Sequence, residues 1–95
     1  MTPTFEELRA YAASRPGEML TTLHRRKPFF VGVSGDEILI TTSNGKFRTT
    51  DRKYVSAVLK RLHETGSFSP SDYMDLTFNA SYILTLVKRW QDGGT

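Results

Sequence analysis

The sequence predicts a single α+β domain over residues 1–95, with an N-terminal helix, a three- or four-stranded antiparallel β-meander and then three helices, two long and one short. Three observations predict this order of elements. Apolar residues recur at helical spacing near both ends of the chain, and the middle of the chain alternates with a period of two. A chain of 95 residues is also the right size for one hydrophobic core.

The first fifteen residues carry the signals of a helix over residues 4–15. Thr4 and Glu7 have the spacing of a capping box, in which each side chain accepts a hydrogen bond from a free backbone N–H at the helix start. Pro16-Gly17 then ends the helix. The apolar residues that share one face of this helix are Phe5, Leu8, Tyr11 and Ala12.

The middle of the chain has the period of two that is typical of strands. Residues 29–33 and 38–42 are β-branched or aromatic runs bounded by turn residues, and residues 47–50 form a shorter run. Residues 18–23 are ambiguous. The sequence therefore predicts three strands, or four if residues 18–23 pair with the others.

Two turn signals set the predicted register of the strands. Asn44-Gly45 suits a two-residue type I′ turn, because both residues tolerate a positive φ, and this turn places Thr41 opposite Arg48. A second tight turn at Gly35-Asp36 places Phe30 opposite Thr41. We therefore expect Phe30, Thr41 and Arg48 to lie side by side across three strands.

These registers divide the predicted sheet into two unequal faces. The inner face should pack against helices, and its residues are Phe29, Val31, Val33, Ile38, Ile40 and Phe47. The outer face is only half polar, and its residues are Phe30, Gly32, Leu39, Thr41 and Arg48. Two interpretations of the outer face stay open: it is an exposed platform for a ligand, or it is buried under the first helix or a second chain.

Three helices are predicted after the sheet, each from a start signal followed by apolar residues at helical spacing. The aromatic residues of this region are expected in the core: Tyr73, Phe78, Tyr82 and Trp90. The predicted limits are Asp51 to Gly66 for the first helix, Ser69 to about Leu76 for the second, and Asn79 to Gly93-Gly94 for the third.

The segment from Asp51 to Trp90 resembles a helix-turn-helix unit. Gly66-Ser67-Phe68-Ser69-Pro70-Ser71-Asp72-Tyr73 is similar to the opening of the middle helix in bacterial winged-helix regulators, and Asn79-Ala80-Ser81 is similar to the cap of their recognition helix. In this chain the strands precede the unit, whereas a wing would follow it. The resemblance implies contacts with a DNA major groove. The residues it would place there are Asn79, Ser81, Thr85 and Lys88.

The composition excludes several kinds of site. The chain has no cysteine, which excludes disulfides, thiolate zinc sites, iron–sulfur clusters and cysteine nucleophiles. Its two histidines, His24 and His63, lack the spacing of metal ligands, so we expect no metal and no cofactor. Neither a run of 18 apolar residues nor a basic-then-apolar leader occurs, which predicts a cytoplasmic protein without membrane contact.

Positive charge is concentrated in the middle of the chain. The net charge is only +3, but residues 24–61 hold nine Lys or Arg against three Asp or Glu. Basic groups beside an aromatic side chain are typical of proteins that bind phosphates and stack bases. The leading hypothesis is a small non-enzymatic binding module for DNA or RNA. Its predicted contact residues are Arg25, Arg26, Lys27, Phe30, Lys46, Arg48, Arg52 and Lys53.

Two alternatives belong to other functional classes. A protein–protein interaction or homodimerisation domain would use the outer sheet face, where Phe30 and Leu39 lie, or a free strand edge. A small ribonuclease would use His24 as acid or base next to the basic residues that follow it, with Glu18 or Glu37 as its second catalytic group.

Overall fold

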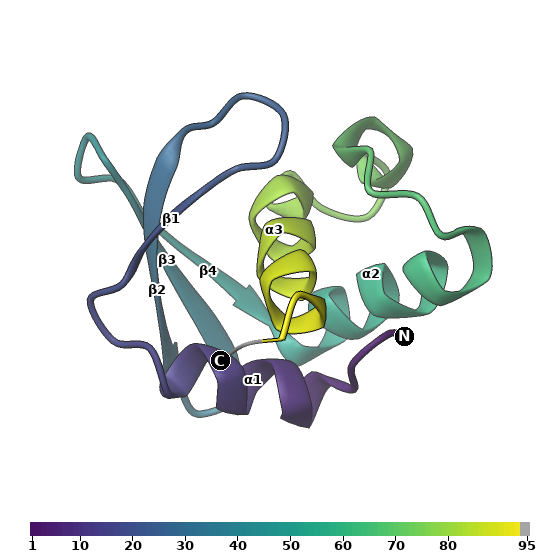
Figure 1. Ribbon diagram of the computed structural model, residues 1–95, viewed down its shortest axis with the longest axis horizontal. Helices are drawn as coiled ribbons and strands as arrows, with labels where there is room; N and C mark the ends of the chain where they lie inside the picture. Colours follow the sequence, from purple (N-terminus) through teal and green to yellow (C-terminus); the bar gives the residue numbers. More distant parts are fainter. Residues whose placement is uncertain (94–95) are drawn as a thin grey trace.

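A four-stranded antiparallel sheet with the strand order β1-β2-β3-β4 forms one layer of the computed structural model, which describes residues 1–93 (Figure 1). The structure confirms the predicted α+β fold with four strands, since residues 18–23 contain the first of them. The predicted helix end at Gly93-Gly94 lies partly outside the described residues. The strands are β1 (Met19–Thr21), β2 (Pro28–Ser34), β3 (Glu37–Thr42) and β4 (Phe47–Asp51). The helices are α1 (Phe5–Ala13), α2 (Arg52–Thr65), the 3₁₀ helix η1 (Pro70–Tyr73) and α3 (Ala80–Gln91).

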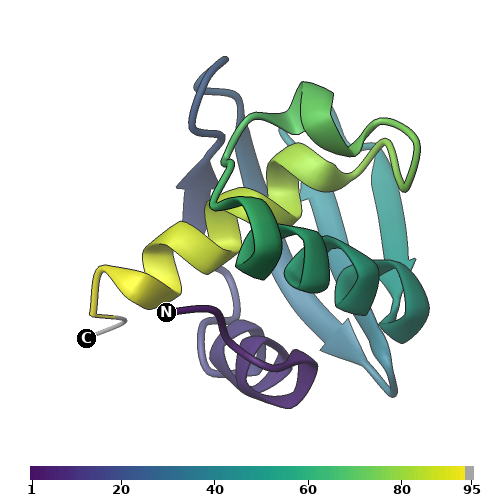
Figure 2. The ribbon, with the colours of Figure 1, turned by 90° about the vertical axis from the view of Figure 1, so that its right-hand side faces the viewer.

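The helices lie on one side of the sheet and form the second layer (Figure 1). Turned by 90°, the structure shows α3 crossing the sheet and α1 lying at one end of it (Figure 2). No described element covers the other side of the sheet. The inner face of the sheet buries Leu20, Phe29, Val31, Ile38 and Ile40. The helices contribute the other side of the core through Leu8, Val55, Val58, Leu62, Ile83 and Leu86, among others.

The ends of α1 and α2 follow the signals in the sequence. The backbone N–H of Thr4 donates to Glu7 Oε1 at 2.9 Å, and that of Glu7 donates to Thr4 Oγ1 at 3.1 Å, which confirms the capping box. Asp51 Oδ1 accepts from the N–H of Tyr54 at 3.2 Å, and Gly66 ends α2 at φ 71°. No helix within residues 1–93 combines the length and the apolar character needed to cross a bilayer.

The segment between α2 and α3 contains one turn of 3₁₀ helix. η1 stops at Tyr73, before the predicted end near Leu76. Ser69 and Asn79 occupy the N-cap positions of η1 and α3, but neither side chain makes a cap hydrogen bond. The capping role predicted for these two side chains is therefore wrong. Asn79 Nδ2 instead donates to the carbonyl of Thr49 on β4 at 3.4 Å.

The β3–β4 hairpin has a three-residue loop, whereas the sequence predicted two residues. The N–H of Thr42 donates to the carbonyl of Lys46 at 2.8 Å, which closes the loop around residues 43–45. Gly45 takes a positive φ of 83°, and Asn44 does not. A type I′ turn needs a positive φ at both residues, whereas a type I turn followed by a glycine bulge needs it only at the glycine. The loop is of the second kind.

The longer loop shifts the register by one residue and exchanges the faces of the β4 side chains. Thr41 pairs with Phe47, and Ile40 pairs with Arg48. Phe47 therefore lies on the outer face, 62% exposed, and its predicted place in the core is wrong. Arg48 lies on the inner face, so its predicted place beside Phe30 is also wrong. Phe30 does lie opposite Thr41 as predicted.

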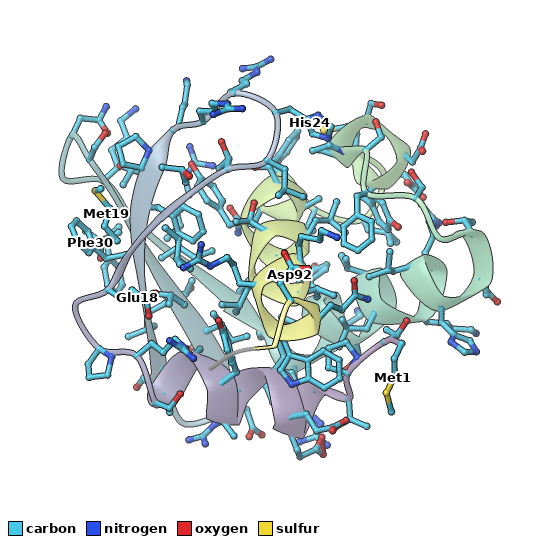
Figure 3. All side chains as sticks on the ribbon, viewed as in Figure 1. Met1, Glu18, Met19, His24, Phe30 and Asp92 are labelled. Atoms are coloured by element: carbon cyan, nitrogen blue, oxygen red, sulfur yellow. The ribbon has the colours of Figure 1, made fainter. Side chains whose placement is uncertain are left out.

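The outer face is exposed in the described part of the chain. Phe30 is 38% exposed and lies next to Met19 on the side of the sheet away from the helices (Figure 3). Helix α1 packs against the inner face, where it buries Phe5 and Leu8. Burial of Phe30 under the first helix, one of the two interpretations drawn from the sequence, is therefore wrong.

Three of the four C-terminal aromatic residues pack in or against the core, and the fourth does not. Tyr73 is fully buried, and Tyr82 and Trp90 are partly buried against the core. Phe78 is 77% exposed, so its predicted place in the core is wrong. The reason is local: Phe78 precedes the N-cap residue Asn79, and the helical spacing that buries the α3 side chains does not extend to it.

We expect Gly45→Ala to destabilise the fold and Gly32→Ala to be tolerated. Alanine at a φ of 83° is strained and costs about 1 kcal/mol. A Cβ at Gly32 on β2 would lie 4.0 Å from the Cβ of Leu39, which is an ordinary contact. The added side chain would also lower the conformational entropy of the unfolded chain, which stabilises the fold by roughly 0.4–1 kcal/mol. Urea unfolding of both variants measures the difference. Equal losses would contradict the glycine bulge.

Candidate functional site

A cleft of about 600 Å³ opens between segments that are far apart in the sequence. They are the β1–β2 loop (residues 22–27), the segment 68–74 that contains η1, and the start of α3, with one residue from β4. Figure 3 shows His24 of the loop next to η1. Pockets for small ligands have volumes of roughly 300–1,000 Å³. We call this site the basic cleft, and its lining residues are Thr22, Leu23, His24, Arg25, Lys27, Arg48, Phe68, Ser69, Pro70, Ser71, Met74, Phe78, Ala80, Ser81 and Tyr82.

Three permanent cations and no carboxylate line the basic cleft. The cations are Arg25, Lys27 and Arg48, and His24 adds an imidazole. Five ion pairs occur within residues 1–93, and none of them includes any of these three cations. Charges of one sign in a concave site focus the electric field and raise the local concentration of counter-ions. The cleft therefore attracts anions.

The guanidinium of Arg48 is held between α3 and the sheet. Arg48 Nη1 lies 3.5 Å from Asn79 Oδ1, to which it donates, and the guanidinium carbon lies 5.8 Å from the centre of the Tyr82 ring. The Tyr82 ring in turn meets Phe29 edge to face, with 5.0 Å between the ring centres. This chain of contacts connects the cation to the core, so the position of Arg48 depends on the packing of α3 against the sheet.

The β1–β2 loop is attached to α3 by a buried threonine. Thr85 is 1% exposed, and its hydroxyl donates to the carbonyl of Ser81 at 2.7 Å and accepts from the N–H of Leu23 at 3.2 Å. Within the loop, Thr22 Oγ1 accepts from the N–H of Lys27 at 2.9 Å, and Arg26 adopts a left-handed φ of 53°. These contacts hold the loop in one conformation and fix the backbone on both sides of its cations.

The opposite wall of the cleft is attached to both the loop and α2. His24 Nε2 lies 3.1 Å from the carbonyl of Phe68, within hydrogen-bond distance. The Tyr73 hydroxyl donates to the carbonyl of Ser67 at 2.6 Å. Arg61 on α2 pairs with Asp75 at 2.6 Å, and this hydrogen bond lowers the pKa of Asp75 below its ordinary value. Protonation of Asp75 as the pH falls removes the ion pair that connects this wall to α2.

Apolar side chains lie among the cations. Phe78 and Met74 are exposed, and Phe68 and Tyr82 line the cleft while packing partly against the core. Hydroxyl groups accompany them at Ser69, Ser71 and Ser81. Of these residues, only Ser81 was a predicted contact residue, through the helix-turn-helix resemblance. No local signal marked Phe78 as exposed, because an apolar residue directly before a helix cap often packs against the first turns of that helix.

A second hollow of about 560 Å³ adjoins the basic cleft. It lies between β4, the start of α2 and the turn before α3, and its lining includes Thr49, Tyr54, Thr77 and Asp75, the carboxylate that pairs with Arg61. The two hollows share Arg48, Met74 and Phe78. Together they form a continuous groove that passes over Arg48.

The structure brings three of the eight predicted contact residues into the cleft: Arg25, Lys27 and Arg48. Arg26 belongs to the same β1–β2 loop but does not line the cleft, and Lys46 lies on the β3–β4 loop outside it. Phe30 lies on the opposite side of the sheet. Arg52 and Lys53 begin α2, where Arg52 pairs with Glu6. The basic segment is therefore divided between several surfaces.

The four residues that the helix-turn-helix resemblance placed in a major groove do not form one exposed surface. Thr85 is buried, and its hydroxyl is used within the protein. Asn79 bonds to Arg48 and Thr49, and Lys88 pairs with Asp92 at 3.5 Å. Ser81 lines the basic cleft. Leu84, which precedes Thr85, is also fully buried.

The carboxylates considered for acid–base chemistry lie away from His24. Glu18 pairs with Arg15 and Arg89, and Figure 3 shows it well removed from His24. Glu37 lies at the end of β3 remote from the β1–β2 loop. Within residues 1–93 no group of three or more His, Asp or Glu could hold a metal ion. What the cleft offers chemically is cations, hydroxyls and aromatic surface.

The site is thus characterised by three cations without ion-pair partners, one exposed aromatic side chain, Phe78, and two partly buried ones, Phe68 and Tyr82. Comparison of the chain with protein-family models, with curated proteins and with solved structures finds no match.

Proposed function

We propose that this chain is a small non-enzymatic module that binds single-stranded nucleic acid in the basic cleft. One observation carries the proposal: Arg25, Lys27 and Arg48 converge without carboxylate partners on a cleft that also exposes Phe78. Proteins that bind single strands combine a basic groove for the phosphates with aromatic side chains on which bases stack.

The groove over Arg48 supports an extended ligand. Because the two hollows meet at Arg48, Met74 and Phe78, one phosphate at Arg48 would leave room for chain on both sides. Arg25 and Lys27 would bind further phosphates on the side of the β1–β2 loop, and the Phe78 ring would stack on a base. The affinity of a base for an aromatic ring is roughly 1–3 kcal/mol.

A single strand fits this surface better than a duplex. A concave cleft can bind an unstacked base of a single strand. Recognition of a duplex by a helix instead requires an exposed helix face that enters the major groove. On α3, Leu84 and Thr85 are buried against the protein. The helix-turn-helix interpretation is thus the weaker form of the nucleic-acid hypothesis.

We expect a fluorescein-labelled single-stranded oligonucleotide to bind in fluorescence anisotropy, with a strong dependence on salt. Three phosphate contacts give a slope of about −2 for log K against log salt, so affinity falls roughly twentyfold between about 50 and 200 mM salt. The same sequence as a duplex, and an abasic strand of equal length, should both bind more weakly because neither presents a free base. No binding of the single strand at about 20 mM salt would contradict the proposal.

A further inference from the structure

The two hollows of the groove differ in charge. The lining of the basic cleft has three permanent cations and no carboxylate. Among the described residues, the lining of the second hollow adds no cation to the shared Arg48, and it includes the carboxylate of Asp75. Arg61 pairs with Asp75 but does not line the hollow. The positive charge of the groove is therefore concentrated on the side of the β1–β2 loop.

The groove is also closed on that side, because its two walls meet there. His24 Nε2 of the β1–β2 loop lies 3.1 Å from the carbonyl of Phe68 on the opposite wall, and the N–H of Leu23 donates to Thr85 on α3. Thr85 lies about one helical turn beyond Ser81, which lines the cleft, whereas the second hollow lies before α3 begins. Figure 2 shows the loop beside the segment that leads from α2 into η1. A strand that enters from the second hollow therefore reaches the end of the groove in the basic cleft.

We propose that the basic cleft binds the terminal phosphate of a single strand, and that the nucleotides next to it lie over Arg48 and in the second hollow. This inference rests on the proposed function and names the part of the strand that the cleft recognises. At neutral pH a phosphate monoester carries roughly 1.5 to 2 negative charges, whereas an internal phosphate diester carries about one. The additional charge is stabilised where Arg25, Lys27 and Arg48 line one cleft.

Hydroxyl groups on the η1 wall suit the additional oxygen of a terminal phosphate. The hydroxyls of Ser69 and Ser71 lie 2.9 Å apart, and both residues line the cleft. Because one of the two donates to the other, the second keeps its proton free to donate to a phosphate oxygen. The neighbouring carboxylate of Asp72 accepts from the Ser67 hydroxyl and does not line the cleft. The wall therefore offers a donor without adding a negative charge.

Three single strands of one sequence test the inference. They are roughly eight nucleotides long, carry the same internal fluorescein and end in a 5′-phosphate, a 3′-phosphate or hydroxyl groups only. In fluorescence anisotropy we expect at least one phosphorylated strand to bind about fivefold or more tightly than the unphosphorylated strand. The phosphorylated end with the higher affinity is the end that the cleft holds. If neither phosphate raises the affinity about fivefold, the inference is overturned and the proposed function stands, whereas no binding of any strand would overturn both.

Lys27→Glu tests where the terminal phosphate lies. The substitution leaves the hydrogen bond within the loop in place, because that bond uses the backbone N–H of Lys27. The preference for the phosphorylated strand should fall below about twofold, since the cleft then repels the additional charge. Lys53→Glu makes the same change of charge at the start of α2, outside the basic cleft, and should keep the preference of the parent within about twofold. Equal preferences in the two variants would overturn the placement of the terminal phosphate in the cleft.

Discussion

Arg48→Glu is expected to reduce the affinity for a single-stranded oligonucleotide by at least about tenfold, which is the largest effect of any single surface substitution. Arg48 is the cation shared by both hollows, and its guanidinium is held over Tyr82. Reversing its charge removes a phosphate contact and adds repulsion. Fluorescence anisotropy at several salt concentrations should also show the salt slope falling by about 1.

Lys53→Glu is the matched control for this substitution. It changes the net charge by the same amount and lies in the same basic segment of the sequence, but at the start of α2 and outside the basic cleft. We expect a loss of less than about threefold, from the long-range field alone. If both variants lose affinity equally, the ligand responds to net charge and the cleft is not its binding site.

Phe29→Ala is expected to destabilise the fold by about 3–5 kcal/mol, whereas Phe30→Ala, one residue further along β2, should cost less than about 1 kcal/mol. Phe29 is fully buried and packs edge to face against Tyr82, so its removal leaves a cavity in the core. Phe30 lies on the exposed outer face. Domains of this size have a total stability of about 5–15 kcal/mol, so the first variant is close to unfolding.

Urea unfolding measures both values. Similar midpoints for the two variants would contradict the assignment of the two sheet faces. The folded fraction of the Phe29→Ala variant should also bind nucleic acid more weakly. The reason is that Tyr82, which lies beneath Arg48, loses the Phe29 ring that supports it. Phe30→Ala should leave that affinity unchanged.

Local signals predicted most of the elements correctly. The capping box at Thr4, the cap at Asp51 and the glycine at residue 66 act through backbone groups a few residues away, so they can be recognised without knowledge of the rest of the fold. Of the candidate site, the sequence predicted Arg25, Lys27 and Arg48 as contact residues, although it placed Arg48 on the other face of the sheet. It could not separate them from Arg52 and Lys53, because charge counts along the chain do not say which surface a side chain reaches.

The sequence by itself determined the α+β order of the elements, their main boundaries and the amphipathic faces that form the core. The tertiary structure decided the register of β4 and the composition of the cleft. Asn44-Gly45 is compatible with either a two-residue turn or a three-residue loop, and a change of one residue exchanges the faces of Phe47 and Arg48. Which face each takes depends on contacts with residues far along the chain: Arg48 lies over Tyr82, 34 positions later in the sequence. The cleft likewise joins a loop, a strand and two helix ends whose proximity no local interaction encodes.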